Sequence, residues 1–397
     1  MSEFYTPLLL PPALVQAQHT FGFALLRQVT QATPQANVFL SPFSIAMALL
    51  LALEGSAGAT HEAIANTLQV GQIPPDKLLA AVARQVAVLT QQEPDQPIFC
   101  VANSLWASKH FALAPAFAAR LQQQYQAEAA TLDFTAPSAA DTINAWVSRH
   151  TQGRITKMVA ASDFTQQTAL LLINAVYFKG SWETAFDAAN TQPGLFMLAD
   201  GTQQLVPLMR QRSEQIGYQK GTGWQAVQLH YSGHPRSASM QLFIPDAPTG
   251  LPEFLEGLTT ENWGRWQANF AQQHGAVEVD LTLPRFRLEW EQDLSTALCN
   301  MVLGPALDPG ADFTPMGFSN EAPGSISQIT HKTYLNVDEQ GTEAAGVTAI
   351  MVWMAGGGPA TPPRRVIVRA DRPFFCAIVD NETGTILFSG AVYQPGT

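Results

Sequence analysis

The residues with the clearest potential for nucleophilic chemistry are Gly55-Ser56-Ala57-Gly58, followed closely by His61 and Glu62. A serine that attacks carbonyl groups from a sharp strand-to-helix turn needs glycine two positions before it and two positions after it, and here position 54 is Glu. His61-Glu62 would begin a zinc-binding H-E-x-x-H helix, but position 65 is Ala. We therefore expect a helix-terminating turn at Ser56 and no hydrolase site.

The remaining reactive side chains are too scattered to predict a catalytic or metal-binding site. The 8 His residues are dispersed, the Asp and Glu residues do not cluster as a calcium site requires, and no P-loop or G-x-G-x-x-G motif follows a strand. Cys100, Cys299 and Cys376 are far apart and include no C-x-x-C pair, which predicts buried free thiols. The sequence thus predicts a protein that is not an enzyme and has no metal or other cofactor.

The overall charge argues against two classes of partner. The chain of 397 residues has 32 acidic and 21 basic side chains, for a net charge of −11. Proteins that bind nucleic acid or an anionic membrane surface need a concentration of positive charge. We therefore expect neither nucleic acid nor membrane as a partner. A hydrophobic content of 46% is ordinary for a globular protein.

The N-terminal sequence does not predict secretion. The first basic residue is Arg27, so no cationic segment precedes Leu8-Leu9-Leu10, and Pro11 and Pro12 interrupt that apolar run. The longest apolar stretch, residues 45–53, is far shorter than the roughly 20 residues that span a bilayer. These features predict a cytoplasmic or leaderless protein, and the few lysines and free cysteines suggest a prokaryotic source.

Helical and strand patterns occupy different parts of the chain. Apolar spacing predicts helices first, at 13–31, at 44–53 (buried on all sides), at 60–68 with Thr60 as N-cap, at 114–127 and at 138–150. Strand formers dominate later, at 169–178, 238–245, 276–286 and 374–379. Helices followed by strands predict an α+β fold, because a doubly wound sheet would alternate the two.

One segment does not fit these patterns. Residues 341–355 are small or β-branched and almost uncharged, a composition compatible with a strand. They lead directly into Gly356-Gly357-Gly358-Pro359-Ala360-Thr361-Pro362-Pro363, which must be an exposed loop. This mismatch is the most informative local feature of the chain.

Six segments in order along the chain resemble the serpin family of serine protease inhibitors. They are residues 37–68, 103–134 with an N-x-L-W strand, 144–159 with W-V-x-x-x-T-x-G-x-I, 174–186 (NAVYFKGSWETAF), 337–346 (VDEQGTEAAG) and 372–395. The resemblance implies an α+β serpin fold, with helices packed on three mostly antiparallel β-sheets. It also implies a single domain over residues 1–397 and an exposed reactive-centre loop at about 339–363.

The resemblance implies a suicide-substrate mechanism. In serpins, a protease cleaves the exposed loop, and the amino-terminal part of the loop then inserts as a new strand in the central sheet. The protease, still attached as an acyl-enzyme, is dragged away and distorted. Loop insertion is a known example of a strain-releasing switch.

The hinge of this loop has the residue pattern that insertion requires. The matching hinge residues are Glu339, Gly341, Thr342, Glu343, Ala344, Ala345 and Gly346. Alternate side chains of an inserting strand face inward, and one such set begins with Thr342, Ala344 and Gly346, none of which is charged. Glu343 belongs to the other set and should face water, because burial of an unpaired charge is costly. The pattern favours an inhibitory serpin over a non-inhibitory one.

Two further clusters follow from the resemblance. A sheet-gate cluster of Ser41, Ser44, Asn174 and His331 matches the family's polar network beneath the central strands. An upper-sheet cluster matches an ion pair of Arg285 and Glu339 with Trp182 nearby. We expect the gate to hold two discrete arrangements. Loss of the ion pair should promote loop–sheet polymerisation of an otherwise monomeric protein.

The family's spacing from the hinge glutamate places the cleaved bond between Ala355 and Gly356, with Met354 and Trp353 as alternatives for the residue before it. A backward count from Arg372 ends at Pro359 instead, so the exact bond stays open. Small or apolar residues at this place predict elastase-like, chymotrypsin-like or subtilisin-like serine proteases as partners. The alternative is a non-inhibitory serpin that acts as a binding or chaperone module.

Overall fold

Helix α2 (Pro42–Leu53) lies at the centre of the fold and is buried along its whole length. Its N-cap is Ser41, whose side chain accepts a hydrogen bond from the backbone N–H of Ser44. Since almost every side chain of the helix is apolar, it needs packing partners on all sides. The computed structural model describes residues 10–90, 96–111, 113–233, 238–273, 277–318, 324–342 and 364–396, and in it α2 packs between two sheets.

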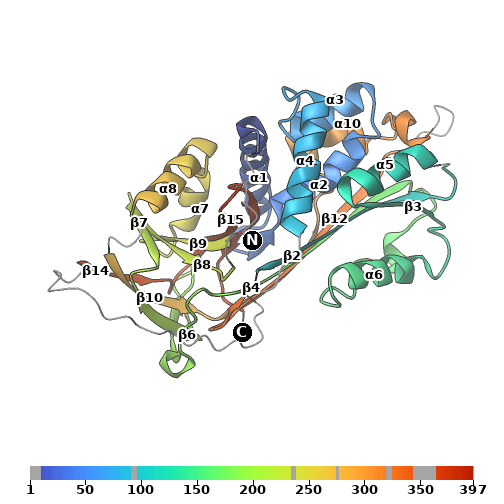
Figure 1. Cartoon of the computed structure of the whole chain (residues 1–397). Coiled ribbons are helices and arrows are strands. Elements are labelled where there is room, and N and C mark those ends of the chain that lie inside the picture. The colour runs from blue at the N-terminus through green and yellow to red at the C-terminus, as the bar shows by residue number, and fades with distance from the viewer. Residues whose placement is uncertain are drawn as a thin grey trace, which may run out of the picture.

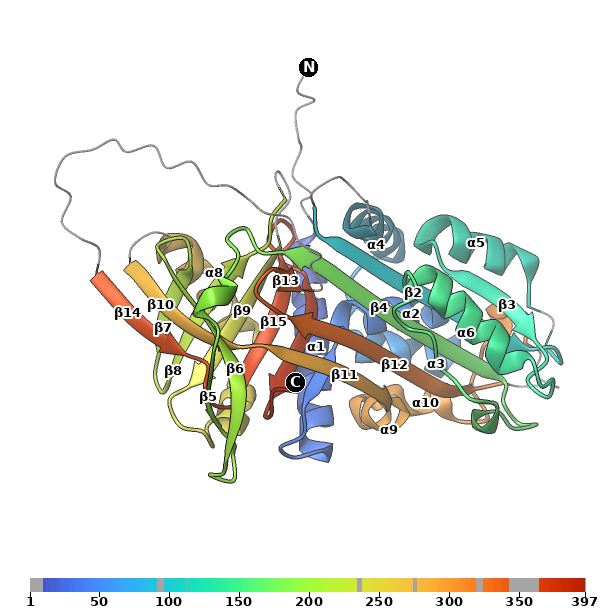
Figure 2. The same ribbon diagram turned by 90° about the horizontal axis from the view of Figure 1, so that it is seen from below.

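The first of these sheets, here called the long sheet, runs diagonally through Figure 2. Its strand order is β11 (Phe286–Asp293), β12 (Ile326–Val337), β13 (Gly341–Thr342), β4 (Leu170–Ser181), β2 (Ile98–Ser108) and β3 (Glu128–Leu132). The pairs β12–β4 and β2–β3 are parallel, and the other neighbours are antiparallel. The near-continuous apolar sequence of β4 fits its burial on both faces.

Two further sheets complete the strand arrangement of the described residues. The core sheet packs on the other side of α2, in the order β1 (Val38–Leu40), β16 (Ile386–Val392), β15 (Phe374–Asp380), β9 (Ala238–Pro245), β8 (Trp224–His230) and β7 (Gly217–Gly221). The small sheet has the order β14 (Arg364–Arg369), β10 (Val277–Pro284), β6 (Gln203–Ser213) and β5 (Gln192–Met197). Only β10–β14 is parallel in these two sheets, so the predicted α+β fold with three mostly antiparallel sheets is confirmed.

The other helices cover the sheets (Figure 1). Helix α6 (Ala139–His150) packs on the outer face of the long sheet, where Trp146 meets Trp106 of β2 edge to face. The remaining helices are α1 (Pro12–Ala32), α3 (Gly58–Thr67), α4 (Pro75–Thr90), α5 (Pro115–Tyr125), α7 (Leu251–Glu256), α8 (Thr260–Gln273), α9 (Ser295–Leu298) and α10 (Gly304–Leu307). No described helix is both long and apolar enough to cross a membrane.

Three local predictions were wrong. Helix α3 begins at Gly58 with Ala57 as its N-cap, and the Thr60 hydroxyl instead accepts a hydrogen bond from the backbone of Asp312. The strand predicted over 276–286 is two strands, because the chain turns at Arg285 into another sheet. Cys376 is buried and Cys100 is half-buried, but Cys299 is exposed.

Candidate functional site at the seam of the long sheet

The contact between β12 and β4 changes along its length, and we call this contact the seam. In its lower part the two strands pair directly, from Ile326 opposite Leu170 to Thr333 opposite Val176. In its upper part the two residues of β13 lie between the strands, with Thr342 opposite both Val337 and Gly180. Figure 2 shows β13 at this end of the long sheet. In the described part of the chain, β13 therefore consists of two residues and does not extend into the lower part of the seam.

The entry of β13 into the sheet depends on Gly341. Its φ is +152°, and a Cβ atom there would lie 2.1 Å from the carbonyl oxygen of Gly180, so a larger residue does not fit. The next side chain, Thr342, is fully buried, and its hydroxyl is 2.7 Å from that of Tyr231. The Tyr231 ring in turn stacks on Trp182, with centroids 4.6 Å apart. Thr342 thus has the inward orientation that the alternation predicts.

The upper-sheet cluster lies directly above this point. Nε of Arg285 is 2.7 Å and Nη2 is 2.6 Å from the carboxylate of Glu339, which is only 5% exposed. The Trp182 indole donates to the backbone oxygen of Asp338 at 2.9 Å. Burial works to raise the pKa of Glu339, but hydrogen bonds from Arg285 and Thr191 outweigh it and lower that pKa. The start of the hinge is thus held by a charge-assisted contact at Glu339.

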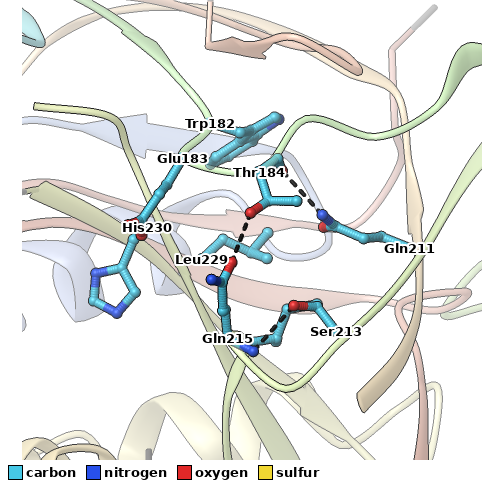
Figure 3. Close-up of a pocket in the computed structure, with 9 residues that line it drawn as sticks. Trp182, Glu183, Thr184, Gln211, Ser213, Gln215, Leu229 and His230 are labelled. Atoms are coloured by element: carbon cyan, nitrogen blue, oxygen red, sulfur yellow. Dashed lines mark hydrogen bonds between the residues drawn. The ribbon is translucent and has the colours of Figure 1, made fainter. Parts of the chain in front are cut away.

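A small pocket of about 20 Å³ lies beside Trp182 (Figure 3). Thr184 joins its walls, because its hydroxyl donates to Gln215 at 2.8 Å and its carbonyl accepts from Gln211 at 3.0 Å. Such a volume has room for only one or two water molecules. This pocket is therefore too small for a substrate.

The four predicted gate residues meet below, in the lower part of the seam. Nε2 of His331 accepts a hydrogen bond from the backbone N–H of Ser41 at 3.0 Å, and the Ser41 hydroxyl donates to the carbonyl of Leu387 at 2.6 Å. The Asn174 amide donates to the carbonyl and hydroxyl of Ser44. His331 is fully buried, and burial lowers its pKa to about 3, so the imidazole is neutral near pH 7.

Two members of this network were missed in the sequence. Asn103 of β2 accepts a hydrogen bond from Asn174, and the Thr333 hydroxyl donates to the carbonyl of Phe39. Asn103 is the asparagine of the N-x-L-W segment, but that motif did not indicate its contact with Asn174, and Thr333 is one of several polar residues in β12. Oδ1 of Asn174 is buried without a hydrogen-bond partner in the described part of the chain. An incompletely paired buried network can favour rearrangement.

The predicted site residues therefore divide into two groups. The structure brings together Ser41, Ser44, Asn174 and His331 at the gate, and Trp182, Arg285 and Glu339 at the upper sheet, next to Gly341 and Thr342. Glu343, Ala344, Ala345 and Gly346 of the hinge, and Trp353, Met354, Ala355 and Gly356 at the bond, lie outside the described residues. The described residues contain no group of His, Cys, Asp and Glu that could hold a metal ion.

Comparisons with known proteins agree with this architecture. A family model described as "Serpin (serine protease inhibitor)" matches residues 16–395. The leukocyte elastase inhibitor of Sus scrofa is 32% identical over 389 residues, which cover 96% of this chain and 99% of the relative. Human thyroxine-binding globulin superimposes with a TM-score of 0.85 at 25% identity over 97% of this chain and 99% of that one. An Arabidopsis serpin in its native stressed conformation gives 0.81 at 28% identity, over 96% and 98%.

Proposed function

The chain belongs to the serpin family, and on that premise we propose that it is a monomeric inhibitor of serine proteases that acts as a suicide substrate. We infer that its 397 residues form one domain, and that the loop predicted at about 339–363 serves as bait in the part that follows Thr342, because Glu339 and Thr342 are themselves buried. The protease serine attacks the carbonyl carbon of Ala355, the amide bond to Gly356 breaks, and a proton passes to the departing amine. The resulting ester holds the protease on the loop.

The position of β13 is the observation that supports this proposal most. Gly341 and Thr342 already occupy the place between β12 and β4 that a longer inserted strand would fill. Below them the direct pairing of β12 with β4 ends at Thr333 and Val176. Insertion therefore needs no new entry point and only extends a strand that has begun.

The energetic argument concerns the exchange of pairings along the seam. An inserting strand breaks the parallel pairing of residues 326–333 with 170–176 and replaces it with two new pairings, one to each neighbour. Each added backbone hydrogen bond contributes about 1 kcal/mol. Antiparallel pairs, such as β13 already makes on both sides, are also slightly more stable than parallel ones. The exchange favours insertion and can oppose hydrolysis of the ester.

The target class follows from the bait residues. Ala355 suits the small specificity pocket of elastase-like and subtilisin-like enzymes, Met354 suits elastase-like and chymotrypsin-like enzymes, and Trp353 suits chymotrypsin-like enzymes alone. No Lys or Arg occurs between Glu339 and Arg364, which disfavours trypsin-like targets. The name of the porcine relative, an elastase inhibitor, agrees with this choice.

The experiment incubates the chain separately with pancreatic elastase, chymotrypsin and subtilisin, followed by denaturing electrophoresis. We expect a band at the summed mass of chain and protease that resists SDS, and mass spectrometry of the released fragment should place the cut after Ala355 or Met354. Protease whose serine has been blocked is the control and should give no such band. Cleavage without trapping by all three proteases would instead favour the non-inhibitory alternative.

A further inference from the structure

The outer face of the small sheet exposes an unusual share of the apolar side chains in the described part of the chain. The inner face packs toward the core sheet, where Phe196 of β5 meets Phe374 of β15 edge to face. Four of the five large apolar residues that the described chain exposes lie on the opposite, outer face, and they are Leu195, Met197, Leu205 and Ile367. Exposed apolar residues gathered on one face are typical of an interaction surface.

Positive charge gathers on the same face. The outward side chains of the four strands include four arginines, namely Arg210 and Arg212 of β6 and Arg365 and Arg369 of β14. They include only two carboxylates, Glu278 and Asp280 of β10, which lies between those strands. This surplus is opposite in sign to the net charge of −11 of the whole chain. The face therefore attracts an acidic partner that the rest of the molecule repels.

Asp280 holds two of these arginines in place. Its carboxylate oxygens lie 3.0 Å from Nε and 3.1 Å from Nη2 of Arg210, and 3.3 Å from Nη2 of Arg212. The hydrogen bond from Arg210 lowers the pKa of Asp280, so the carboxylate stays ionised near pH 7. Since a guanidinium has five N–H donors, both arginines keep donors for a partner. Side chains that are already fixed lose less freedom when a partner binds.

The covalent chain brings a protease to this face. Strand β14 begins at Arg364, and residues 357–363 alone separate it from Gly356 at the predicted bond. Seven residues span at most about 30 Å, whereas a protease of about 270 residues is roughly 45 Å across. Figure 2 shows β14 at one end of the molecule, at the edge of the small sheet. A protease bound at the predicted bond therefore stands beside the small sheet.

The size of the face suits such a partner. The eleven residues of β6 make it roughly 30 Å long, and four strands make it about 20 Å wide. The product is about three quarters of the roughly 800 Å² that each partner contributes to a standard protein–protein interface. Arginines around an exposed apolar residue such as Ile367 also match the composition of interface centres.

We propose that the outer face of the small sheet is a second docking surface for the target protease, and that its arginines select proteases with acidic residues beside the active site. This inference rests on the proposed function, which supplies a protease as the partner. It adds a selection that the bait residues do not make. The loop fits the specificity pocket of the protease, whereas the face contacts the surface around that pocket.

The first test compares two forms of one protease. Subtilisin whose lysines are succinylated has an acidic surface, and unmodified subtilisin has the same catalytic site without it. Arg365→Gln combined with Arg369→Gln should reduce kcat/KM for loop cleavage by the succinylated enzyme at least three-fold at low salt, and should not slow the unmodified enzyme. At about 0.5 M salt the reduction should disappear, because exposed charges are screened.

The matched control removes the same charge elsewhere. Arg84→Gln combined with Arg149→Gln changes exposed sites on α4 and α6, which lie away from the small sheet in both Figure 1 and Figure 2. This variant should leave kcat/KM for both forms of subtilisin unchanged. Equal slowing of the succinylated enzyme by the two double variants would mean that net charge alone governs the encounter, and would overturn the docking surface.

The second test measures the apolar contribution without any cleavage. Succinylated subtilisin with its catalytic serine replaced by alanine should bind the chain with a Kd that Ile367→Thr raises at least three-fold. The increase should be the same at low and high salt, because an apolar contact is not screened. Val302→Thr is the matched control, since Val302 is the fifth exposed apolar residue and lies outside the small sheet. Equal Kd values for these two variants would contradict contact at Ile367.

The outcomes separate this proposal from the proposed function. If the loop is cut at rates that depend on Arg365 and Arg369 but no protease is trapped, the proposed inhibition fails and the docking surface stands. If protease is trapped at rates that ignore these arginines, the docking surface fails and the inhibition stands. If neither form of subtilisin cuts or binds the chain, both proposals fail.

A cationic and apolar face also has the chemistry to contact an anionic lipid surface, and vesicles with one quarter phosphatidylglycerol test this alternative. We expect no sedimentation of the chain with these vesicles. Sedimentation that Arg365→Gln combined with Arg369→Gln abolishes, together with unchanged rates of loop cleavage, would assign the face to lipid and overturn the proposal.

Discussion

The two ends of the seam are held together by different physics. At the upper end an Arg–Glu ion pair fixes the first residue of the hinge, and the Arg285 side chain is 46% exposed. At the lower end the gate is fully buried, and it holds β12, β4 and α2 together through neutral hydrogen bonds at His331, Asn174 and Ser44. A charge-assisted contact at a half-exposed edge resists displacement of the hinge. A neutral network can exchange partners without bringing a charge into the core.

This difference predicts that the upper-sheet cluster and the gate control different steps of insertion. The upper-sheet cluster should set where the loop enters, because Glu339 and Trp182 both hold the chain immediately before Gly341. The gate should set how readily the strands separate, because the direct pairing of β12 with β4 passes through His331 and Asn174. Four predictions test this division, from the largest expected effect to the smallest.

Cleavage of the loop should produce the largest effect, because it allows the seam to open along its full length. A strand of about a dozen residues would add backbone hydrogen bonds worth about 1 kcal/mol each, and Ile350 and Val352, if they turn inward, about 1.5–3 kcal/mol each. The melting temperature of the cleaved chain should therefore rise by tens of degrees, which differential scanning calorimetry can measure. An unchanged melting temperature after a single cut near Ala355 would mean that the gate stays closed.

Thr342→Arg should have the next largest effect, because it places a charge at the first buried position of the entering strand. Thr342 is fully buried against Tyr231 before cleavage, so the arginine should keep β13 out of the sheet, and its guanidinium would have to leave water without a partner when the loop inserts, at a cost of several kcal/mol. Each 1.4 kcal/mol on the insertion barrier slows insertion about ten-fold, while hydrolysis of the ester continues. The molar ratio of chain to protease needed for inhibition should therefore rise by more than ten-fold.

Two variants serve as controls for Thr342→Arg. Tyr231→Phe removes the hydrogen bond to Thr342 but keeps the ring stacked on Trp182, so its ratio should stay close to that of the unsubstituted chain. Glu343→Arg changes the next residue, which the alternation predicts to face water. A ratio for Glu343→Arg as high as that for Thr342→Arg would show that the predicted alternation is wrong.

Arg285→Ala should have a moderate effect that is confined to the upper end. It leaves the buried Glu339 carboxylate with Thr191 as its remaining side-chain partner, which should lower the free energy of unfolding by about 1–2 kcal/mol. The loosened hinge should also increase polymers after mild heating, visible on a native gel. Arg287→Ala is the matched control, because Arg287 pairs with Glu289 at the surface, where a pair contributes little. Equal losses for both variants would contradict a special role for the upper-sheet cluster.

The sequence predicted those parts of the fold that depend on local pattern. The strand at 238–245 and the complete burial of α2 agree with the structure, since apolar runs and period-two patterns act within one element. The prediction of Thr60 as the N-cap of α3 was wrong, because the Thr60 hydroxyl accepts a hydrogen bond from the backbone of Asp312, which is far along the chain. No local pattern contains such a contact.

Part of the candidate site could also be predicted from the sequence, through its motifs. The motif resemblance brought Asn174 and His331 together, and the structure places them opposite each other across the seam. The role of Asn103 follows only from the pairing of β2 with β4, and that of Tyr231 from its place just after β8, beside Thr342. The pairing of Gly341 and Thr342 between β12 and β4 is also a tertiary property.

The smallest expected effect is the loss of folding stability in acid, which should begin at different pH values for the two ends of the seam. His331 has a folded-state pKa of about 3 against an ordinary value of 6.5, because burial disfavours the imidazolium. Between these values the unfolded chain binds a proton that the folded chain does not, so stability falls as pH drops below about 6.5. One such group contributes at most about 1.4 kcal/mol per pH unit. Glu339, whose pKa is lowered from 4.5, contributes stability above that value and loses it only in stronger acid.

His331→Gln isolates the gate's share of this acid sensitivity. The Gln amide oxygen can still accept from Ser41 but does not titrate, so urea unfolding at pH 6.5, 5.5 and 5.0 should show a shallower loss of stability than the unsubstituted chain. The slope should not vanish, because burial also lowers the pKa of His19 in α1. His110→Gln, at an exposed position after β2, should leave the slope unchanged. If the His331→Gln slope equals that of the unsubstituted chain, the gate histidine is not held neutral by burial, and the contrast between a neutral gate and a charged upper cluster does not hold.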